Sequence, residues 1–471
     1  MLFNSIQFLI FFLVVTILYF LLPYALRWVL LLIASCVFYM AYIPYYILIL
    51  AFTICVDYIA GISIENAQGH RRKLFLVISL ISNIGILAFF KYFNFLNDNL
   101  AELGQLLHQP FGLQHLSIML PIGLSFHTFQ AMSYTIEIYR GNQKAERHFG
   151  IFSLYVMFYP QLVAGPIERP QNLLHQFREK HSFDYGRVTD GLKLMLWGFF
   201  KKVVIADRLA NYVDQVYGNP AGYHGLPIII ATIFFAFQIY CDFSGYTDIA
   251  IGAAQVMGFH LMDNFNRPYF SASISEFWRR WHISLSSWFR DYMYISLGGN
   301  RVTIPRWYFN LFITFLVSGL WHGANWTFII WGALNGFYVI LELVLKPVIK
   351  KLPGIFKLKA LNILITFILI DFAWIFFRAS SLQNAMLIIK NMLHFADGGL
   401  KWAIFDKYDF AICVVSILFM EWVHHLERHN KMRHLFSDRP LVFRWVMYIG
   451  ILWALWIYGV FGAREFIYFA Y

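Results

Sequence analysis

Long runs of apolar residues, separated by short polar segments, recur along almost the whole chain. The first run, Ser5–Leu22, is just long enough to cross a hydrocarbon layer of ~30 Å at ~1.5 Å per residue. No basic segment or small-x-small cleavage site accompanies it, so we expect a retained helix rather than a signal peptide. The other runs are Trp28–Ala41, Tyr45–Ser63, Lys73–Tyr92, Phe149–Val163, Gly191–Ile205, Leu226–Tyr240, Trp307–Leu320, Trp326–Leu345, Leu361–Phe377, Phe410–Trp422 and Phe443–Phe461. The pattern predicts an all-α polytopic integral membrane protein with about eleven to twelve transmembrane or re-entrant helices.

Two segments between the apolar runs are rich in aromatic residues and are expected to form re-entrant or interfacial helices. Pro121 and Gly123 interrupt Ile118–Tyr134, whereas Ser271–Tyr294 mixes aromatic residues with arginines, which is typical of a helix near the lipid headgroups. No internal repeat is visible, and the least apolar segments are too short for a soluble domain. We therefore expect one domain over residues 1–471, with its chemistry in the membrane body.

The composition supports this class and bounds the partners. Of 471 residues, 59% are hydrophobic and 13% are charged, whereas a soluble domain has about a quarter charged residues. The formal charge of +11 does not indicate nucleic acid binding, because the basic residues form short clusters beside apolar runs, the pattern of cytoplasmic loops in a bacterial inner membrane. The clusters are His70–Lys73, Lys201-Lys202, Lys346–Lys351 and Arg433.

Several kinds of site have no motif in this chain. The scattered cysteines have no C-x-x-C spacing, so neither a disulfide framework nor a metal site is expected. Phosphate-binding loops, nucleophile elbows, zinc-protease motifs and dinucleotide fingerprints are also missing from the sequence. No bound cofactor is therefore expected. A transferase built from these residues would use a general-base histidine and an already activated donor such as a thioester.

The stretch Asn264–Trp331 contains ionisable residues in strongly apolar surroundings. His322 stands in Trp321-His322-Gly323-Ala324-Asn325, between two apolar runs. Ionisable residues at membrane depth are candidate functional residues, and histidine suits proton transfer at neutral pH. A hydrogen bond to a neighbouring helix, worth about 1 kcal/mol, accounts for His322 equally well.

His282 lies in EFWRRWHISLSSWFRD, for which we expect a helix over Ser275–Tyr292. On such a helix one stripe consists of Trp278, His282, Leu285 and Phe289. His282 is therefore either a satisfied core histidine or a second polar group facing His322. Glu276, Arg279 and Arg280 lie off the stripe, where the arginines anchor the helix at headgroups by snorkelling or contact an anionic ligand.

A third unusual stretch is Tyr240–Asp248, which carries Asp242, Tyr246 and Asp248. Gly245 indicates a break or a close helix approach. We expect the two carboxylates to pair with Arg267, Arg279 or Arg290 and so to organise a polar cavity. A solvated amphipathic face is expected for His424, His425, Arg428, His429 and His434.

Four segments together resemble the membrane-bound O-acyltransferase (MBOAT) family, in particular its bacterial branch of alginate O-acetylation. They are LVAGPIERPQNLLHQF, YCDFSGYTDIAIG, NFNRPYFSASISEFWRRWHISLSSWFRDYMYISLGGNR and SGLWHGANWTFIIWGALNG. The resemblance implies a ring of transmembrane helices around a polar tunnel, with a catalytic core over about residues 120–335. It places the family's essential histidine on His322 and its second motif residue on His282. It also implies acetyl-CoA as a cytoplasmic donor and an extracytoplasmic partner of the SGNH or acetylesterase-like type.

The leading hypothesis is therefore O-acetylation of an exported or cell-envelope polysaccharide. His322 would act as general base or in relay of the acetyl group, and His282 would orient groups or handle a proton. The remaining candidates for donor binding or the tunnel are Asp242, Tyr246, Asp248, Trp278, Arg279, Arg280, Arg290, Trp321 and Asn325. Alginate, peptidoglycan, another exopolysaccharide and teichoic acid all remain open as acceptors. A transporter or polysaccharide channel, and an inert scaffold for a partner enzyme, are the alternatives from other classes.

Overall fold

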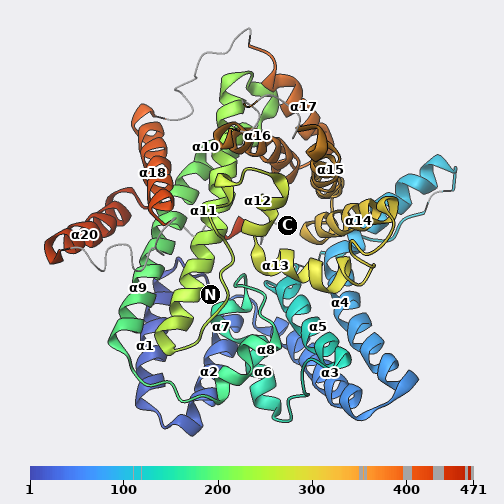
Figure 1. Cartoon of the computed structure of the whole chain (residues 1–471), viewed down its shortest axis with the longest axis vertical. Helices are drawn as coiled ribbons and strands as arrows, with labels where there is room; N and C mark the ends of the chain where they lie inside the picture. Colours follow the sequence, from blue (N-terminus) through green and yellow to red (C-terminus); the bar gives the residue numbers. More distant parts are fainter. Residues whose placement is uncertain are drawn as a thin grey trace. The chain divides into compact units, whose positions relative to one another are not determined.

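The computed structural model describes residues 1–109, 111–117, 119–349, 354, 358–395, 406–427, 440–461 and 465–467. These residues form helices and no strand, which confirms the predicted all-α class (Figure 1). The chain divides into two compact units: unit 1 comprises Met1–Leu192 and Ala250–Met262, and unit 2 comprises Lys193–Ile249 and Asp263–Tyr471. The single domain with a catalytic core at about 120–335 stays a prediction. Parts of the predicted basic and histidine-rich loops, Lys350, Lys351 and Arg428 to His434, lie outside the described residues.

Unit 1 contains the N-terminal helices. They are α1 (Ile6–Leu21), α2 (Tyr24–Met40), η1 (Pro44–Tyr46), α3 (Ile47–Asn66), α4 (Gly69–Leu106), α5 (Leu124–Arg140), α6 (Phe149–Met157), α7 (Tyr159–Leu162), α8 (Pro170–Leu173) and η2 (His175–Arg178). Asp57 on α3 accepts hydrogen bonds from Ser79 and Asn83 on α4, at 2.6 and 2.9 Å, so this buried carboxylate joins the two helices. The predicted re-entrant segment becomes α5, which is almost wholly buried.

Two helices have residues in both units: α9 (Tyr185–Phe199) and α11 (Leu226–Met257). Unit 2 also contains the π-helix η3 (Phe200–Ala206), α10 (Asp207–Gly218), η4 (Pro220–Gly222), η5 (Pro268–Phe270), α12 (Ile274–Arg280), α13 (Ile283–Trp288), the π-helix η6 (Phe289–Tyr294), α14 (Ile304–His322), α15 (Trp326–Ile349), α16 (Lys359–Arg378), α17 (Leu382–Met392), α18 (Lys407–Leu426) and α20 (Leu441–Tyr458). Each apolar run expected from the sequence lies mainly on one helix, except that Phe149–Val163 is divided between α6 and α7 and Gly191–Ile205 between α9 and η3.

Seven helices of the described chain are long and apolar enough to cross a membrane. They are Pro44–Asn66, Gly69–Leu106, Leu226–Met257, Trp326–Val348, Lys359–Arg378, Lys407–Leu426 and Leu441–Tyr458, and α1 and α2 are shorter apolar helices. The 38 residues of α4 give a length of about 57 Å, which exceeds the hydrocarbon thickness. Of the most apolar 18-residue stretch of α11, 72% is buried, whereas the corresponding figure for α20 is 6%. The chain is a multi-pass membrane protein whose α11 is an internal helix and whose α20 presents an apolar face outward.

Glycines allow two helix pairs of unit 2 to approach backbone to backbone. A Cβ on Gly319 of α14 would lie 2.3 Å from the Phe328 carbonyl oxygen and 2.9 Å from the Gly332 Cα of α15. A Cβ on Gly198 of α9 would likewise lie 2.6 Å from the Gly245 carbonyl oxygen of α11, which confirms the close approach expected at Gly245. Lipid provides no hydrophobic driving force for helix association, so close van der Waals packing at small residues holds membrane helices together. The α14–α15 contact fixes the helix end that carries His322.

The α14–α15 contact predicts that Gly319→Ala destabilises the protein, because the added methyl has no space without moving α15. We expect the free energy of unfolding to fall by about 1–3 kcal/mol. The measurement is reversible unfolding in detergent micelles. Gly450→Ala on α20 is the matched control, because no atom lies within 4 Å of its added Cβ. Equal stabilities of the two variants would show that α14 and α15 are not closely packed there.

Candidate functional site

His322 is the last residue of α14, and local structure explains why the helix ends there. Gly323 is extended, and the Asn325 side-chain oxygen accepts a hydrogen bond from the Thr327 backbone N–H at 3.0 Å. This contact caps the start of α15. The Asn325 amide also donates to the Ser380 carbonyl at 3.2 Å. Asn325 therefore shapes the connection between α14 and α15.

Aromatic rings surround the imidazole of His322, which is only 5% exposed. Trp321, Trp331 of α15 and Phe377 of α16 lie edge-on to it, with ring centroids 4.8, 5.0 and 5.4 Å away. Edge-on aromatic contacts are favourable and restrict the rotation of a ring. The structure thus holds a buried histidine in a defined orientation.

His282 lies between α12 and α13 in a left-handed backbone conformation, with φ 44° and ψ 55°. This conformation corrects the predicted continuous helix over Ser275–Tyr292, which is broken at this residue. A non-glycine residue with positive φ costs free energy and is held by surrounding contacts. Here two backbone hydrogen bonds of 2.9 Å connect the preceding chain to the turn, from Ile283 N–H to the Asn264 carbonyl and from Asn266 N–H to the Arg280 carbonyl.

The Asn264 side chain also determines the tautomer of His282, that is, which ring nitrogen carries the hydrogen. Its oxygen accepts from the Ser284 backbone N–H at 3.1 Å and the Ser284 hydroxyl at 3.0 Å, and lies 3.2 Å from His282 Nδ1. Because this oxygen only accepts, His282 Nδ1 carries the hydrogen and Nε2 keeps its lone pair. Burial lowers the pKa of His282 to about 3, so the ring is neutral at physiological pH.

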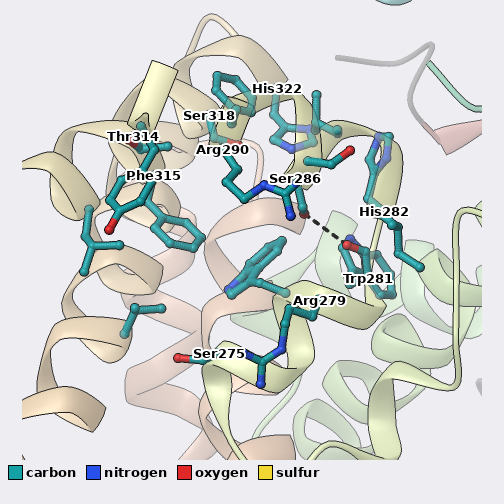
Figure 2. Close-up of a pocket in the computed structure, with 18 of the residues that line it drawn as sticks. Ser275, Arg279, Trp281, His282, Ser286, Arg290, Thr314, Phe315, Ser318 and His322 are labelled. Carbon is teal, nitrogen blue, oxygen red and sulfur yellow. Dashed lines mark hydrogen bonds between the residues drawn. The ribbon is translucent and has the colours of Figure 1, made fainter. Parts of the chain in front are cut away.

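One cavity of unit 2, with a volume of about 380 Å³, is lined by both histidines (Figure 2). We call it the histidine cavity. Its walls come from α12, α13, η6, α14 and α15, and hydroxyl groups of Ser275, Ser286, Ser287, Thr314 and Ser318 add polarity to a mostly apolar lining. The predicted stripe of Trp278, His282, Leu285 and Phe289 lines it in full, although the helix that carries it is interrupted. An apolar cavity with a few convergent polar groups is typical of a small-molecule site.

The other predicted site residues divide between this cavity and separate positions. Arg279 and Arg290 line the histidine cavity and are exposed, and Arg290 forms an ion pair with Asp291 at 2.7 Å. Arg280 pairs with Glu276 at 2.5 Å and lines a different cavity. Trp321 packs edge-on against His322, but neither Trp321 nor Asn325 lines the cavity.

Asp242 and Asp248 pair with lysines, which corrects the expectation of arginine partners. Asp242 lies 2.5 Å from Lys202, and Asp248 lies 2.6 Å from Lys201. Lys202 also pairs with Asp207 at 2.8 Å. Both lysines are buried in the π-helix η3, so the prediction of a cytoplasmic loop at Lys201-Lys202 is wrong. We call this group the lysine–aspartate cluster.

The lysine–aspartate cluster also contacts the segment 465–467. The second oxygen of Asp242 accepts from the Ile467 backbone N–H at 2.7 Å. The buried ring of Phe466 packs against Phe243 and Tyr246, with centroids 5.3 and 5.1 Å away. Phe243 in turn lies edge-on to His282 at 4.5 Å. Asp242, Tyr246 and Asp248 do not line the histidine cavity, and Phe243, the neighbour of Asp242, connects this group to His282.

Asn264 and the aromatic residues around His322 are the contributors that sequence reasoning missed. Asn264 precedes His282 by 18 residues, and no periodic pattern connects the two. Trp331 and Phe377 appear in the sequence as ordinary core aromatics of apolar runs. Only the segment Asn264-Phe265-Asn266, with two polar residues in aromatic surroundings, indicated a structural role for Asn264. Among the described residues, no group of three His, Cys, Asp or Glu side chains is arranged to hold a metal ion.

Comparison with known proteins gives consistent matches over most of the chain. Residues 148–389 match the family model described as MBOAT, membrane-bound O-acyltransferase family. The chain is 42% identical over 405 residues to the probable alginate O-acetylase AlgI of Pseudomonas aeruginosa, covering 84% of this chain and 75% of that protein. It is 36% identical over 390 residues to the peptidoglycan O-acetyltransferase of Helicobacter pylori, with coverages of 77% and 73%. A teichoic acid D-alanyltransferase of Bacillus subtilis is 28% identical over 226 residues, with coverages of 45% and 56%.

The environment of His282 predicts a neutral ring with its proton on Nδ1 from about pH 5 to 8. Nitrogen NMR of histidine-labelled protein in lipid bilayers tests this, with His282→Gln identifying the resonance. Because its pKa falls from 6.5 to about 3 on folding, the unfolded chain binds the proton more readily between these values. Stability should therefore decrease as pH falls through this window, less steeply in His282→Gln. An imidazolium signal near neutral pH would contradict the assignment.

Proposed function

Since this chain belongs to the membrane-bound O-acyltransferase family and is a membrane O-acetyltransferase, we propose that it moves acetyl groups from cytoplasmic acetyl-CoA toward hydroxyls of an exported or cell-envelope polysaccharide, such as alginate. The observation that carries the proposal is the histidine cavity, which two buried histidines line together. The proposed location is the bacterial inner membrane.

His322 is the proposed general base. In the step, the hydroxyl oxygen bonds to the acetyl carbon, its proton passes to the imidazole, and the carbon–sulfur bond breaks to release the coenzyme A thiolate. Return of the proton to that sulfur completes the balance. A positioned base of this kind contributes about 10²–10⁴-fold to rate. The aromatic contacts of His322 support this role because they hold the base at the cavity wall.

His282 is better suited to orientation than to taking the proton. A base with a pKa near 3 holds a proton poorly at neutral pH, but its Nε2 lone pair can accept a hydrogen bond from a hydroxyl. The hydrogen bond to Asn264 keeps this nitrogen in one tautomer. We therefore assign His282 the role of aligning the acceptor hydroxyl with the thioester.

Arg279 and Arg290 are the proposed contacts for the phosphates of acetyl-CoA at the exposed edge of the cavity. Guanidinium groups match phosphate oxygens in geometry and charge. Because the polysaccharide lies outside the cytoplasm, an SGNH or acetylesterase-like protein is proposed to complete delivery. The names of the relatives favour alginate or peptidoglycan over teichoic acid as acceptor, since the D-alanyltransferase matches only 45% of the chain.

The proposal predicts that His322→Ala lowers acetyl transfer from radiolabelled acetyl-CoA in isolated membranes by about 10²–10⁴-fold. His282→Gln should lower the maximal rate by about a hundredfold or less, because misalignment rather than loss of the base slows the reaction. His70→Ala, at the exposed start of α4, is the control and should transfer at the wild-type rate.

Normal transfer by a well-folded His322→Ala protein would refute the assignment of the base. Substrate uptake into vesicles without any thioester would instead favour the transport hypothesis. Equal amounts of folded protein, measured by size-exclusion chromatography, are required for the comparison of all three variants.

A further inference from the structure

A second cavity of unit 2 has a strongly basic lining that the proposed chemistry does not use. Its volume is about 300 Å³, and its lining residues are Arg267, Phe270, Arg280, Lys359, Ala360, Ile363, His424 and His425. We call it the basic cavity. His424 is buried and lies 3.1 Å from the Tyr240 hydroxyl, so the expectation of a solvated amphipathic face is wrong at this residue.

Both arginines of the basic cavity are held in place before any ligand binds. The Arg280 guanidinium pairs with Glu276 at 2.5 Å and donates to the Arg267 carbonyl at 3.5 Å. The Arg267 guanidinium donates to the His424 carbonyl at 3.4 Å, at the end of α18. These contacts limit the side-chain entropy that the arginines would lose on binding a ligand.

The basic cavity lies at the ends of two candidate membrane spans. Lys359 begins the span Lys359–Arg378, and His424 and His425 belong to the last turns of the span Lys407–Leu426. Span ends lie at the depth of the lipid headgroups, where anionic groups are abundant. The first turn of α16, a 20-residue helix, adds partial positive charge from its N–H groups.

The lining of the basic cavity carries more cationic than anionic side chains. The described lining contains two arginines and a lysine but no carboxylate. Glu276 pairs with Arg280, and Glu421 lies 3.5 Å from His424, so both acids are engaged at the margin.

We infer that the basic cavity binds a phosphate group, which either a phospholipid headgroup or a soluble phosphate ester supplies. Two guanidinium groups and an ammonium match phosphate oxygens by charge and hydrogen bonding. The volume falls at the lower end of the range for ligand pockets and suits a phosphate with part of its ester. The inference does not depend on the proposed acetyl transfer, because it concerns binding at a cavity that neither His282 nor His322 lines.

Binding to the purified full-length protein tests the inference with two probes. Adenosine 3′,5′-bisphosphate represents the soluble ester, and titration calorimetry in detergent measures its binding. Phosphatidylglycerol represents the headgroup. It competes in mixed vesicles with a diglucosyl diacylglycerol, which has no phosphate, and native mass spectrometry counts the bound lipids. We expect Arg267→Gln with Lys359→Gln to bind at least one probe about tenfold or more weakly than the wild type.

Lys346→Gln with Lys407→Gln removes the same charge from residues outside the basic cavity and should bind like the wild type. Lys359→Gln alone, at an exposed helix start, gives a variant whose fold is secure and should show a smaller loss. A loss confined to one probe identifies the source of the phosphate. If the cavity variants bind both probes like the control, or if the wild type binds neither, the inference is overturned.

Discussion

The carboxamide oxygen of Asn264 accepts from three donors, and this interaction holds the turn on which the histidine cavity depends. The Ser284 N–H, the Ser284 hydroxyl and His282 Nδ1 converge on it. A left-handed residue costs about 1–2 kcal/mol in isolation, so His282 keeps its backbone conformation only because these contacts offset that cost. The same contacts determine where α12 ends and in which direction α13 leaves.

The turn distributes four consecutive residues between two cavities. Arg279, Trp281 and His282 line the histidine cavity, whereas Arg280 lines the basic cavity. On a continuous helix successive side chains would point about 100° apart, whereas the break at His282 lets Arg279, Trp281 and His282 line the same cavity. The large ring of Trp281 is buried and stacks on Phe277.

Sequence reasoning predicted the helical membrane class because apolar runs of span length have few other structures available in lipid. It also grouped Trp278, His282, Leu285 and Phe289 on one stripe, and all four line the histidine cavity, although residues off the stripe such as Arg279 line it too. The turn itself was missed, since no glycine or proline marks His282 and a distant asparagine stabilises it.

Pairings between distant residues were also beyond the sequence. Lys202 precedes Asp242 by 40 residues, and a charged pair at that separation leaves no periodic trace. Two adjacent lysines beside an apolar run are typical of a cytoplasmic loop, but in the π-helix η3 the pairing of Lys201 and Lys202 with distant aspartates allows them to be buried. The identity of the reaction came from family resemblance and comparison, because a buried histidine in a cavity is compatible with several chemistries.

If the proposed acetyl transfer takes place at His322, the aromatic rings around it have a consequence for the fate of the activated acyl group. Water is the commonest competing nucleophile, and a thioester lost to hydrolysis would be consumed without product. Trp321, Trp331 and Phe377 offer water few hydrogen-bonding partners on the faces of the imidazole that they cover. In the proposed mechanism, where His322 is the base, this enclosure would favour a nucleophile that binds in the cavity over water, so the packing that immobilises the ring would also protect a thioester donor from hydrolysis.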